Sequence, residues 1–170
     1  KSIREIAAER EADEWDTWLD IIAEDPDARG VTGQLEPRAW ALQYYTHSKG
    51  MVGLDTSVFD TEWEMKNPPY TFPGINTFSA FPMFYIKYVR DGGVFTLEEA
   101  VQKTSTMAAR VHNLEGRGVL EEGAHADIVL MDLKGLKVLG DEVEARSHPE
   151  GVEYVFVNGR MVVNKKGHTG

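Results

Sequence analysis

The feature that most constrains the fold is a pair of apolar runs that flank Asn158-Gly159, over residues 152–163. Asn-Gly is a preferred pair for a type I′ turn, because both central residues of that turn need a positive φ. The two runs therefore predict a β-hairpin. A further run of β-type residues at 126–132 predicts another strand. Since turn-forming glycines begin at Gly116, we expect β-structure in the chain after that residue.

Helical patterns fill most of the chain before Gly116. Ser2 with Glu5, and Thr96 with Glu99, have the spacing of a capping box, in which two side chains satisfy backbone N–H groups at the start of a helix. The residue pattern predicts helices that end near residue 25, cover 82–90, start at residue 96, and cover about 107–112. Pro37 and Arg38 open another predicted helix, which continues through 39–46.

One apolar stripe lies on the helix before residue 25. It consists of Trp15, Trp18, Leu19 and Ile22, at positions i, i+3, i+4 and i+7. Stripes at this spacing normally pack against the rest of a domain, so we expect these four side chains in the core. An aromatic box that binds a ligand is the alternative.

The composition argues against several classes of partner. The 170 residues carry 18 Lys and Arg against 28 Asp and Glu, a formal net charge of −10. Because phosphate backbones are bound by clustered cations, we expect no nucleic-acid partner. No apolar run approaches the roughly 18 residues of a membrane span, so we expect no membrane partner. The chain has no Cys, which excludes disulfides and fits a cytoplasmic location.

One acidic residue has a position typical of barrel active sites. Residues 51–54 are a short apolar run that predicts a buried strand, and Asp55 follows at its end. Catalytic groups of α/β barrels lie where strands end at the mouth of the barrel, so Asp55 is a candidate site residue. An Asp that caps a helix or forms a turn is the alternative. The five His residues are widely spaced, and each alone is more typical of a surface or a helix end than of a metal site.

Residues 60–80 combine Pro, Gly and Asn with interleaved aromatic residues, which predicts a long loop. Such a loop forms a lid or a wall of a substrate pocket, or it anchors a crossover connection to the core.

The stretch 96–132, TLEEAVQKTSTMAARVHNLEGRGVLEEGAHADIVLMD, together with GVEYVFVNGRMVV at 151–163, resembles the closing segment of the amidohydrolase superfamily. Within it, the match is to the N-acyl-D-amino-acid deacylases, or D-aminoacylases. The resemblance implies an α/β fold, namely the last part of a metal-dependent (β/α)8 (TIM) barrel followed by C-terminal strands of a small β-sandwich. It assigns 1–115 to the barrel and 116–170 to the sandwich. We therefore expect the chain to be the C-terminal fragment of a longer hydrolase.

The same resemblance implies the chemistry. In the family, the last barrel strand ends in an Asp that binds or faces the metal and takes the proton of the attacking water, and Asp55 is the matching position. Asp55 is therefore expected to be both a catalytic and a metal residue. The implied cofactor is Zn2+, most of whose ligands lie upstream of this chain, so we expect the chain alone to be inactive. The implied substrate is a small-molecule N-acyl amino acid, and specifically an N-acyl-D-amino acid.

Other parts of the resemblance are structural. Gly118, Gly123, Ala126 and Asp127 match turn and sandwich-strand positions, and Asn158-Gly159 the sandwich hairpin. The deacylase branch has Ser before the catalytic Asp and Gly after it, whereas Leu54 and Thr56 flank Asp55 here.

Two alternatives remain open beside the deacylase hypothesis. The first is a cyclic amidase of the dihydroorotase or hydantoinase kind. The second is a non-catalytic remnant or assembly module. A partial barrel leaves strand edges and the Trp15 and Trp18 face uncovered, so we also expect self-association into a homo-oligomer.

Overall fold

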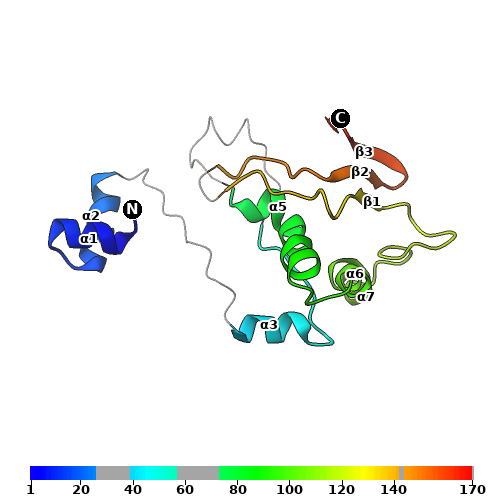
Figure 1. The fold of residues 1–170 in the computed structure, drawn as a ribbon, viewed down its shortest axis with the longest axis horizontal. Helices are drawn as coiled ribbons and strands as arrows, with labels where there is room; N and C mark the ends of the chain where they lie inside the picture. Colours follow the sequence, from blue (N-terminus) through cyan, green and yellow to red (C-terminus); the bar gives the residue numbers. More distant parts are fainter. Residues whose placement is uncertain (26–38, 57–72, 142–143, 170) are drawn as a thin grey trace. The chain divides into compact units, whose positions relative to one another are not determined.

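The computed structural model describes residues 1–25, 39–56, 73–141 and 144–169. The chain divides into two compact units, Lys1–Gln34 and Leu35–Gly170 (Figure 1). The boundary expected between residues 115 and 116, which separates a barrel from a sandwich, stays a prediction.

Two helices form the described part of the first unit, α1 (Ile3–Arg10) and α2 (Glu14–Glu24). The predicted capping box of α1 is confirmed. The Oγ of Ser2 accepts the Glu5 N–H at 3.2 Å, and the Glu5 carboxylate accepts the Ser2 N–H at 2.7 Å. The helix predicted to end near residue 25 does so, because Asp25 leaves the helical conformation.

The apolar stripe of α2 does not form the core of this unit. Trp15 is 75% exposed and Leu19 is 61% exposed, while the small side chains of Ala7 and Thr17 are buried. In the described part of the unit, α2 packs against α1, and of the four residues of the stripe Trp18 is half-buried while Ile22 is exposed like Trp15 and Leu19. The prediction that the stripe lies in the core is therefore wrong for Trp15, Leu19 and Ile22.

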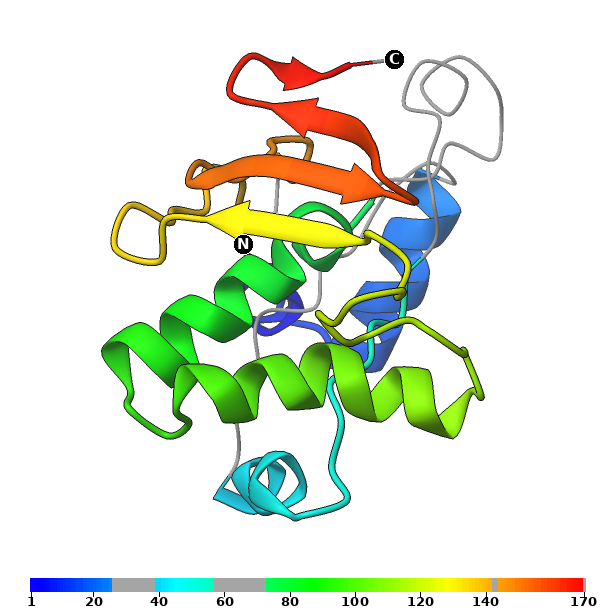
Figure 2. The same ribbon diagram turned by 90° about the vertical axis from the view of Figure 1, so that its right-hand side faces the viewer.

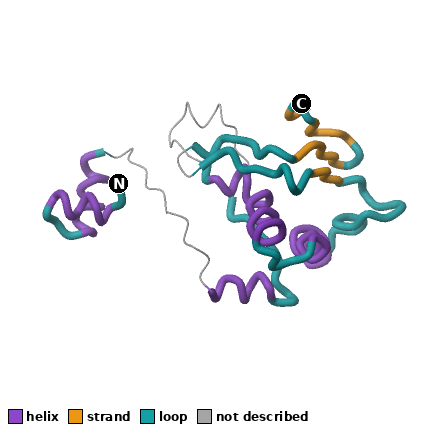
Figure 3. The backbone as a smooth tube through the Cα atoms, viewed as in Figure 1, coloured by secondary structure: helices purple, strands orange, loops and turns teal. Residues whose placement is uncertain are grey.

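The described residues of the second unit include the following helical stretches (Figure 3). They are α3 (Ala39–Thr46), α5 (Ile75–Phe84) continued by the π-helical segment η1 (Tyr85–Asp91), and α6 (Leu97–Val101) continued by η2 (Gln102–Thr106) and α7 (Met107–Val111). The end of α3 at Thr46 and the capping box of Thr96 and Glu99 agree with the predictions, and the predicted opening of α3 at residues 37–38 lies outside the described residues. In the described ranges, no helix is both long and apolar enough to cross a membrane.

The helix expected from residue 82 begins earlier, at Ile75, and Pro82 lies inside it. Proline has no N–H to donate to the carbonyl one turn back, and the wider π-helical turns of η1 follow it. The aromatic loop predicted over residues 60–80 therefore ends before Ile75, and its residues 60–72 lie outside the described residues.

Within the described ranges, four antiparallel strands form the sheet, in the order β1 (Ile128–Met131), β2 (Val152–Val157), β3 (Arg160–Asn164) and β4 (Gly167–His168). The predicted hairpin is confirmed. Asn158 has a φ of 49° and Gly159 a φ of 79°, as a type I′ turn requires. The sheet lies on one side of the α5–η1 and α6–α7 helices, and α3 lies on their other side (Figure 2).

The core lies between the sheet and these helices. Its buried members are Phe84, Tyr85, Phe95, Ala100 and Leu136. The Nη1 of Arg90 donates to the carbonyl of Leu136 at 2.7 Å, which ties η1 to the turn after β1. The helices that carry the candidate site are therefore fixed to the sheet by packing and by this hydrogen bond.

Asp127 joins the turn that contains Arg117 to the hairpin of β2 and β3. Its Oδ1 accepts the Asn158 N–H at 2.7 Å, and its Oδ2 pairs with the guanidinium of Arg117. Arg117 also donates from Nη2 to the Oδ1 of Asn158 at 2.7 Å. These contacts agree with the structural role expected for Asp127 and the Asn158 turn.

The contribution of this junction to the stability of the fold is expected to depend on pH. The N–H of Asn158, and then the guanidinium of Arg117, lower the pKa of Asp127 below its ordinary value of 3.8. A carboxylate with a depressed pKa in the folded state stabilises the fold above the unfolded pKa, and this contribution is lost as the pH falls through the folded pKa. We expect Asp127→Asn to be less stable than the wild type at neutral pH, and the difference to shrink below about pH 4.

Urea unfolding followed by circular dichroism, at about pH 7 and about pH 3, measures this difference. A difference that stays constant down to the lower pH would show that the ionised Asp127 does not stabilise the junction.

Candidate functional site

The segment that carries Asp55 is not the strand that its sequence predicts. Residues 51–56 follow α3 without joining a β-ladder. The N–H of Val52 instead donates to the backbone carbonyl of Lys103, in η2, at 3.0 Å. The strand prediction is wrong because, among the described residues, no strand lies beside this segment to form a ladder. Its backbone is held by a helix.

Lys103 also holds the start of this segment with its side chain. The residue is 8% exposed, and its Nζ donates to the carbonyl oxygens of His47 at 2.9 Å and Gly50 at 3.0 Å. His47 follows the last residue of α3, where helix carbonyls lack partners and carry partial negative charge. The ammonium therefore satisfies the end of α3 and the turn that follows it. We call these two hydrogen bonds the Lys103 clamp.

The turn inside the Lys103 clamp requires glycine. A Cβ atom on Gly50 would lie 2.1 Å from the carbonyl oxygen of Tyr44, which is backbone of α3 and cannot move aside cheaply. The N–H of Gly50 donates to the carbonyl of His47 at 2.9 Å. The absent side chain lets the chain reverse tightly against α3 before it runs toward Asp55.

The far end of the segment is fixed by the start of α5. The Nδ2 of Asn76 donates to the backbone carbonyl of Asp55 at 3.1 Å. The hydroxyls of Thr56 and Thr77 are hydrogen-bonded at 2.6 Å. The backbone of Asp55 is therefore positioned from both sides, by η2 and by α5, although it belongs to neither.

The Asp55 residue itself is exposed. Its backbone carbonyl accepts the hydrogen bond from Asn76, and its carboxylate makes no hydrogen bond or ion pair with a described residue. An accessible carboxylate on a fixed backbone can accept a proton from a bound water and return it to a leaving group.

The described residues do not by themselves fit a zinc ion. They contain no group of three or more His, Cys, Asp or Glu that could hold a metal. Zinc in a protein needs at least three such ligands, and Asp55 supplies one carboxylate. The assignment of Asp55 as a metal residue stays a prediction.

His47 and His112 lie at helix ends, which is one of the two positions expected for single histidines. His47 lies just after α3, and its Nδ1 accepts the Lys49 N–H at 3.1 Å. His112 caps the C-terminus of α7. The ring of His148 contacts the edge of Phe78, with ring centroids 5.4 Å apart. Phe78 was expected in the aromatic loop, but it lies in α5.

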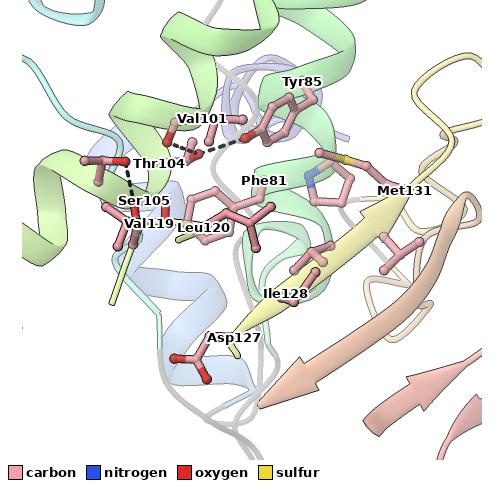
Figure 4. A pocket seen from close by; sticks show the side chains of 15 residues that line it. Phe81, Tyr85, Val101, Thr104, Ser105, Val119, Leu120, Asp127, Ile128 and Met131 are labelled. Atoms are coloured by element: carbon pink, nitrogen blue, oxygen red, sulfur yellow. Dashed lines mark hydrogen bonds between the residues drawn. The ribbon is translucent and has the colours of Figure 1, made fainter. Parts of the chain in front are cut away.

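A cavity of about 650 Å3 lies between the helices and β1 (Figure 4). Its wall is mainly apolar, and Asp55 does not line it. The Tyr85 hydroxyl and the Thr104 Oγ1 are hydrogen-bonded to each other at 2.8 Å, and the Thr106 Oγ1 donates to the carbonyl of Gly118 at 2.6 Å. Burial raises the pKa of Tyr85. Since these hydroxyls have partners within the protein, the cavity is a gap between layers rather than part of the Asp55 site.

The Asp55 segment lies within the range of the chain that matches a known protein family. The model of the amidohydrolase family matches residues 51–163. A D-aminoacylase from Alcaligenes xylosoxydans xylosoxydans is 33% identical over 98 residues, which are 58% of this chain and 20% of the relative. A dihydroorotase from Lactobacillus helveticus (strain DPC 4571) is 39% identical over 70 residues, which are 41% of this chain and 16% of the relative.

A solved structure agrees with these matches. It is the crystal structure of N-acyl-D-glutamate deacylase from Bordetella bronchiseptica, complexed with zinc and a phosphonate inhibitor that mimics the tetrahedral intermediate. The TM-score is 0.52 at 33% identity, and the match covers 53% of this chain and 19% of that chain. The chain spans about a fifth of the length of the proteins it matches.

Proposed function

This chain belongs to the amidohydrolase family, and we propose that it is the C-terminal part of a metal-dependent hydrolase that cleaves C–N amide bonds in small molecules. The observation that carries the proposal is Asp55, an exposed carboxylate whose backbone is fixed by η2 and α5 within the matched range. The proposed substrate is an N-acyl-D-amino acid, which the D-aminoacylase and N-acyl-D-glutamate deacylase relatives support.

The proposed role of Asp55 is proton transfer. Water adds to the carbonyl carbon of the amide while the Asp55 carboxylate accepts its proton. The tetrahedral intermediate then collapses, the C–N bond breaks, and Asp55 returns the proton to the leaving nitrogen. The products are a carboxylic acid and an amine, between which a proton passes to give a carboxylate and an ammonium at neutral pH, and Asp55 is ionised again.

The metal is proposed to be zinc, with Asp55 as one of its ligands and with most of the other ligands outside this chain. The support is that a relative of this chain, N-acyl-D-glutamate deacylase, is complexed with zinc, and that the chain spans about a fifth of that protein. In this arrangement residues 1–115 supply the last units of a TIM barrel, and residues 116–170 supply strands of a β-sandwich.

A second candidate function is a cyclic amidase. The 39% identity to a dihydroorotase over 70 residues favours it. The proton transfer proposed for Asp55 is the same in that reaction, because a cyclic amide is opened by the same addition of water. The two candidates therefore differ in substrate and not in the role of Asp55.

The experiment compares the isolated 170 residues with the protein encoded by the complete reading frame that contains them. Zinc content is measured by mass spectrometry after gel filtration. Hydrolysis is measured with N-acetyl-D-amino acids, N-acetyl-L-amino acids and dihydroorotate. We expect the isolated chain to bind no stoichiometric zinc and to hydrolyse nothing, and the complete protein to favour the N-acetyl-D-amino acids.

Each other outcome decides against part of the proposal. Stoichiometric zinc and turnover by the isolated chain would contradict a metal site built elsewhere. Turnover of dihydroorotate by the complete protein, without turnover of N-acyl amino acids, would favour the cyclic amidase. A complete protein without zinc and without turnover would favour the non-catalytic module.

A further inference from the structure

Lys103 is a buried cation that the proposed chemistry does not use. It is 8% exposed, and among the described residues no carboxylate forms an ion pair with it. Burial of an ammonium without an opposite charge costs free energy unless polar groups replace its water. A Met at this position would fill similar space without that cost. The charge therefore calls for a role other than packing.

The surroundings of the ammonium define that role. Two of its contacts are the carbonyl oxygens of the Lys103 clamp, at 2.9 Å and 3.0 Å. The third is the ring of Phe95, whose centroid lies 5.5 Å from Nζ. All three place partial negative charge against the cation. The ring of Phe95 is itself stacked on Phe84, in the core.

The clamp and the backbone of Lys103 act on one short segment. The side chain binds the carbonyls of His47 and Gly50, and the main-chain carbonyl accepts the Val52 N–H at 3.0 Å. Without the ammonium, two carbonyl oxygens directed at the same point would lose their common donor and repel each other. In the described structure, the segment would then keep the Val52 bond, and Asp55 would keep its bond from Asn76.

We propose that Lys103 is a positioning residue that fixes residues 47–55, and through them the orientation of the Asp55 carboxylate. This rests on the proposed function. A segment outside the sheet has no ladder to set its geometry, so the buried cation replaces the ladder. A displacement of about 1 Å at a catalytic group can cost about a hundredfold in rate, which makes the orientation of this segment consequential.

The test uses the complete protein and three variants. Lys103→Met removes the cation and keeps the stem, and Lys103→Arg keeps a donor that can reach both carbonyls. Lys87→Met is the matched control, because Lys87 is exposed and its Nζ lies 5.9 Å from the Tyr88 ring centroid without a clamp to backbone carbonyls. Hydrogen exchange of the peptides that cover residues 47–56 is measured by mass spectrometry, with kcat and KM on the same samples.

We expect exchange in residues 47–56 to be about tenfold faster in Lys103→Met and unchanged in Lys87→Met, while the β2 and β3 peptides are unchanged in both. We expect kcat of Lys103→Met to fall about 10- to 100-fold, with KM changed less than about threefold, and Lys103→Arg to recover part of the loss. If circular dichroism shows that Lys103→Met does not fold, Lys103→Gln takes its place.

Introducing Lys103→Met into Asp55→Asn separates positioning from general damage. If Lys103 acts through Asp55, the added Lys103→Met substitution lowers the residual rate of Asp55→Asn by less than about threefold. Unchanged exchange in residues 47–56, or an equal loss of rate in both backgrounds, would overturn the proposal. Absence of turnover in the wild type would count against the proposed function, and hydrogen exchange would still decide whether the clamp exists.

Discussion

Replacing Asp55 with Asn is expected to lower kcat of the complete enzyme by about 100- to 10,000-fold. Asn has nearly the same shape, but its amide does not accept the proton of the attacking water. Because Asp55 is exposed and its carboxylate has no partner among the described residues, the free energy of unfolding should change by less than about 0.5 kcal/mol. Steady-state kinetics and urea unfolding of the same preparations measure both quantities.

Asp20→Asn is the matched control for this substitution. Asp20 is exposed on α2, and the change removes the same charge from the protein at a position outside the matched range 51–163. We expect kcat of Asp20→Asn to equal that of the wild type. If Asp55→Asn retained a kcat within about threefold of the wild type, Asp55 would not be the proton acceptor, and the Asp55 site would lose its catalytic assignment.

The parts of the fold that the sequence predicted well are those that local interactions determine. Asn158-Gly159 fixes a turn within four residues, and Thr96 with Glu99 caps a helix within one turn. Neither needs a partner from far along the chain. This is why the hairpin and the capped helices agree with the pattern of residues, whereas the segment before Asp55 does not.

The segment before Asp55 shows what a local pattern lacks. Residues 51–54 have the apolar character of a strand, but a strand exists only beside another strand. In the described structure the neighbour is η2, and Val52 donates to Lys103. The contribution of Lys103 had one signal in the sequence, since it lies three residues after Ala100, on the buried face of a helix. A lysine at that position indicates a charge with a partner in the interior.

The burial of the apolar stripe on α2 was wrongly predicted, because its spacing does not show which element covers it. Of the four residues that share this face by their spacing, Trp15, Leu19 and Ile22 are exposed and Trp18 is half-buried. Periodicity identifies which side chains share a face, but it does not identify the element that covers the face. The fully buried residue of α2 is the smaller Thr17.

Leu136→Ala is expected to lower the free energy of unfolding of the second unit by about 2–5 kcal/mol. Leu136 is fully buried in the core cluster with Phe84, Tyr85 and Phe95. Its backbone carbonyl accepts the hydrogen bond from Arg90, and the substitution leaves that carbonyl in place. The loss therefore comes from the apolar area and the cavity that the shorter side chain leaves between the turn after β1 and the helices. Urea unfolding followed by circular dichroism measures it.

Leu139→Ala removes the same atoms three residues later, where the side chain is 54% exposed, and should change the free energy of unfolding by less than about 0.5 kcal/mol. The comparison isolates burial, because both substitutions change the unfolded chain in the same way. Equal effects of the two substitutions would mean that the sheet is not packed on the helices through Leu136. Since η1 lies in this core and α5 leads into it from Asn76, which holds the Asp55 backbone, a destabilised core should also lower the fraction of protein with an ordered Asp55 site.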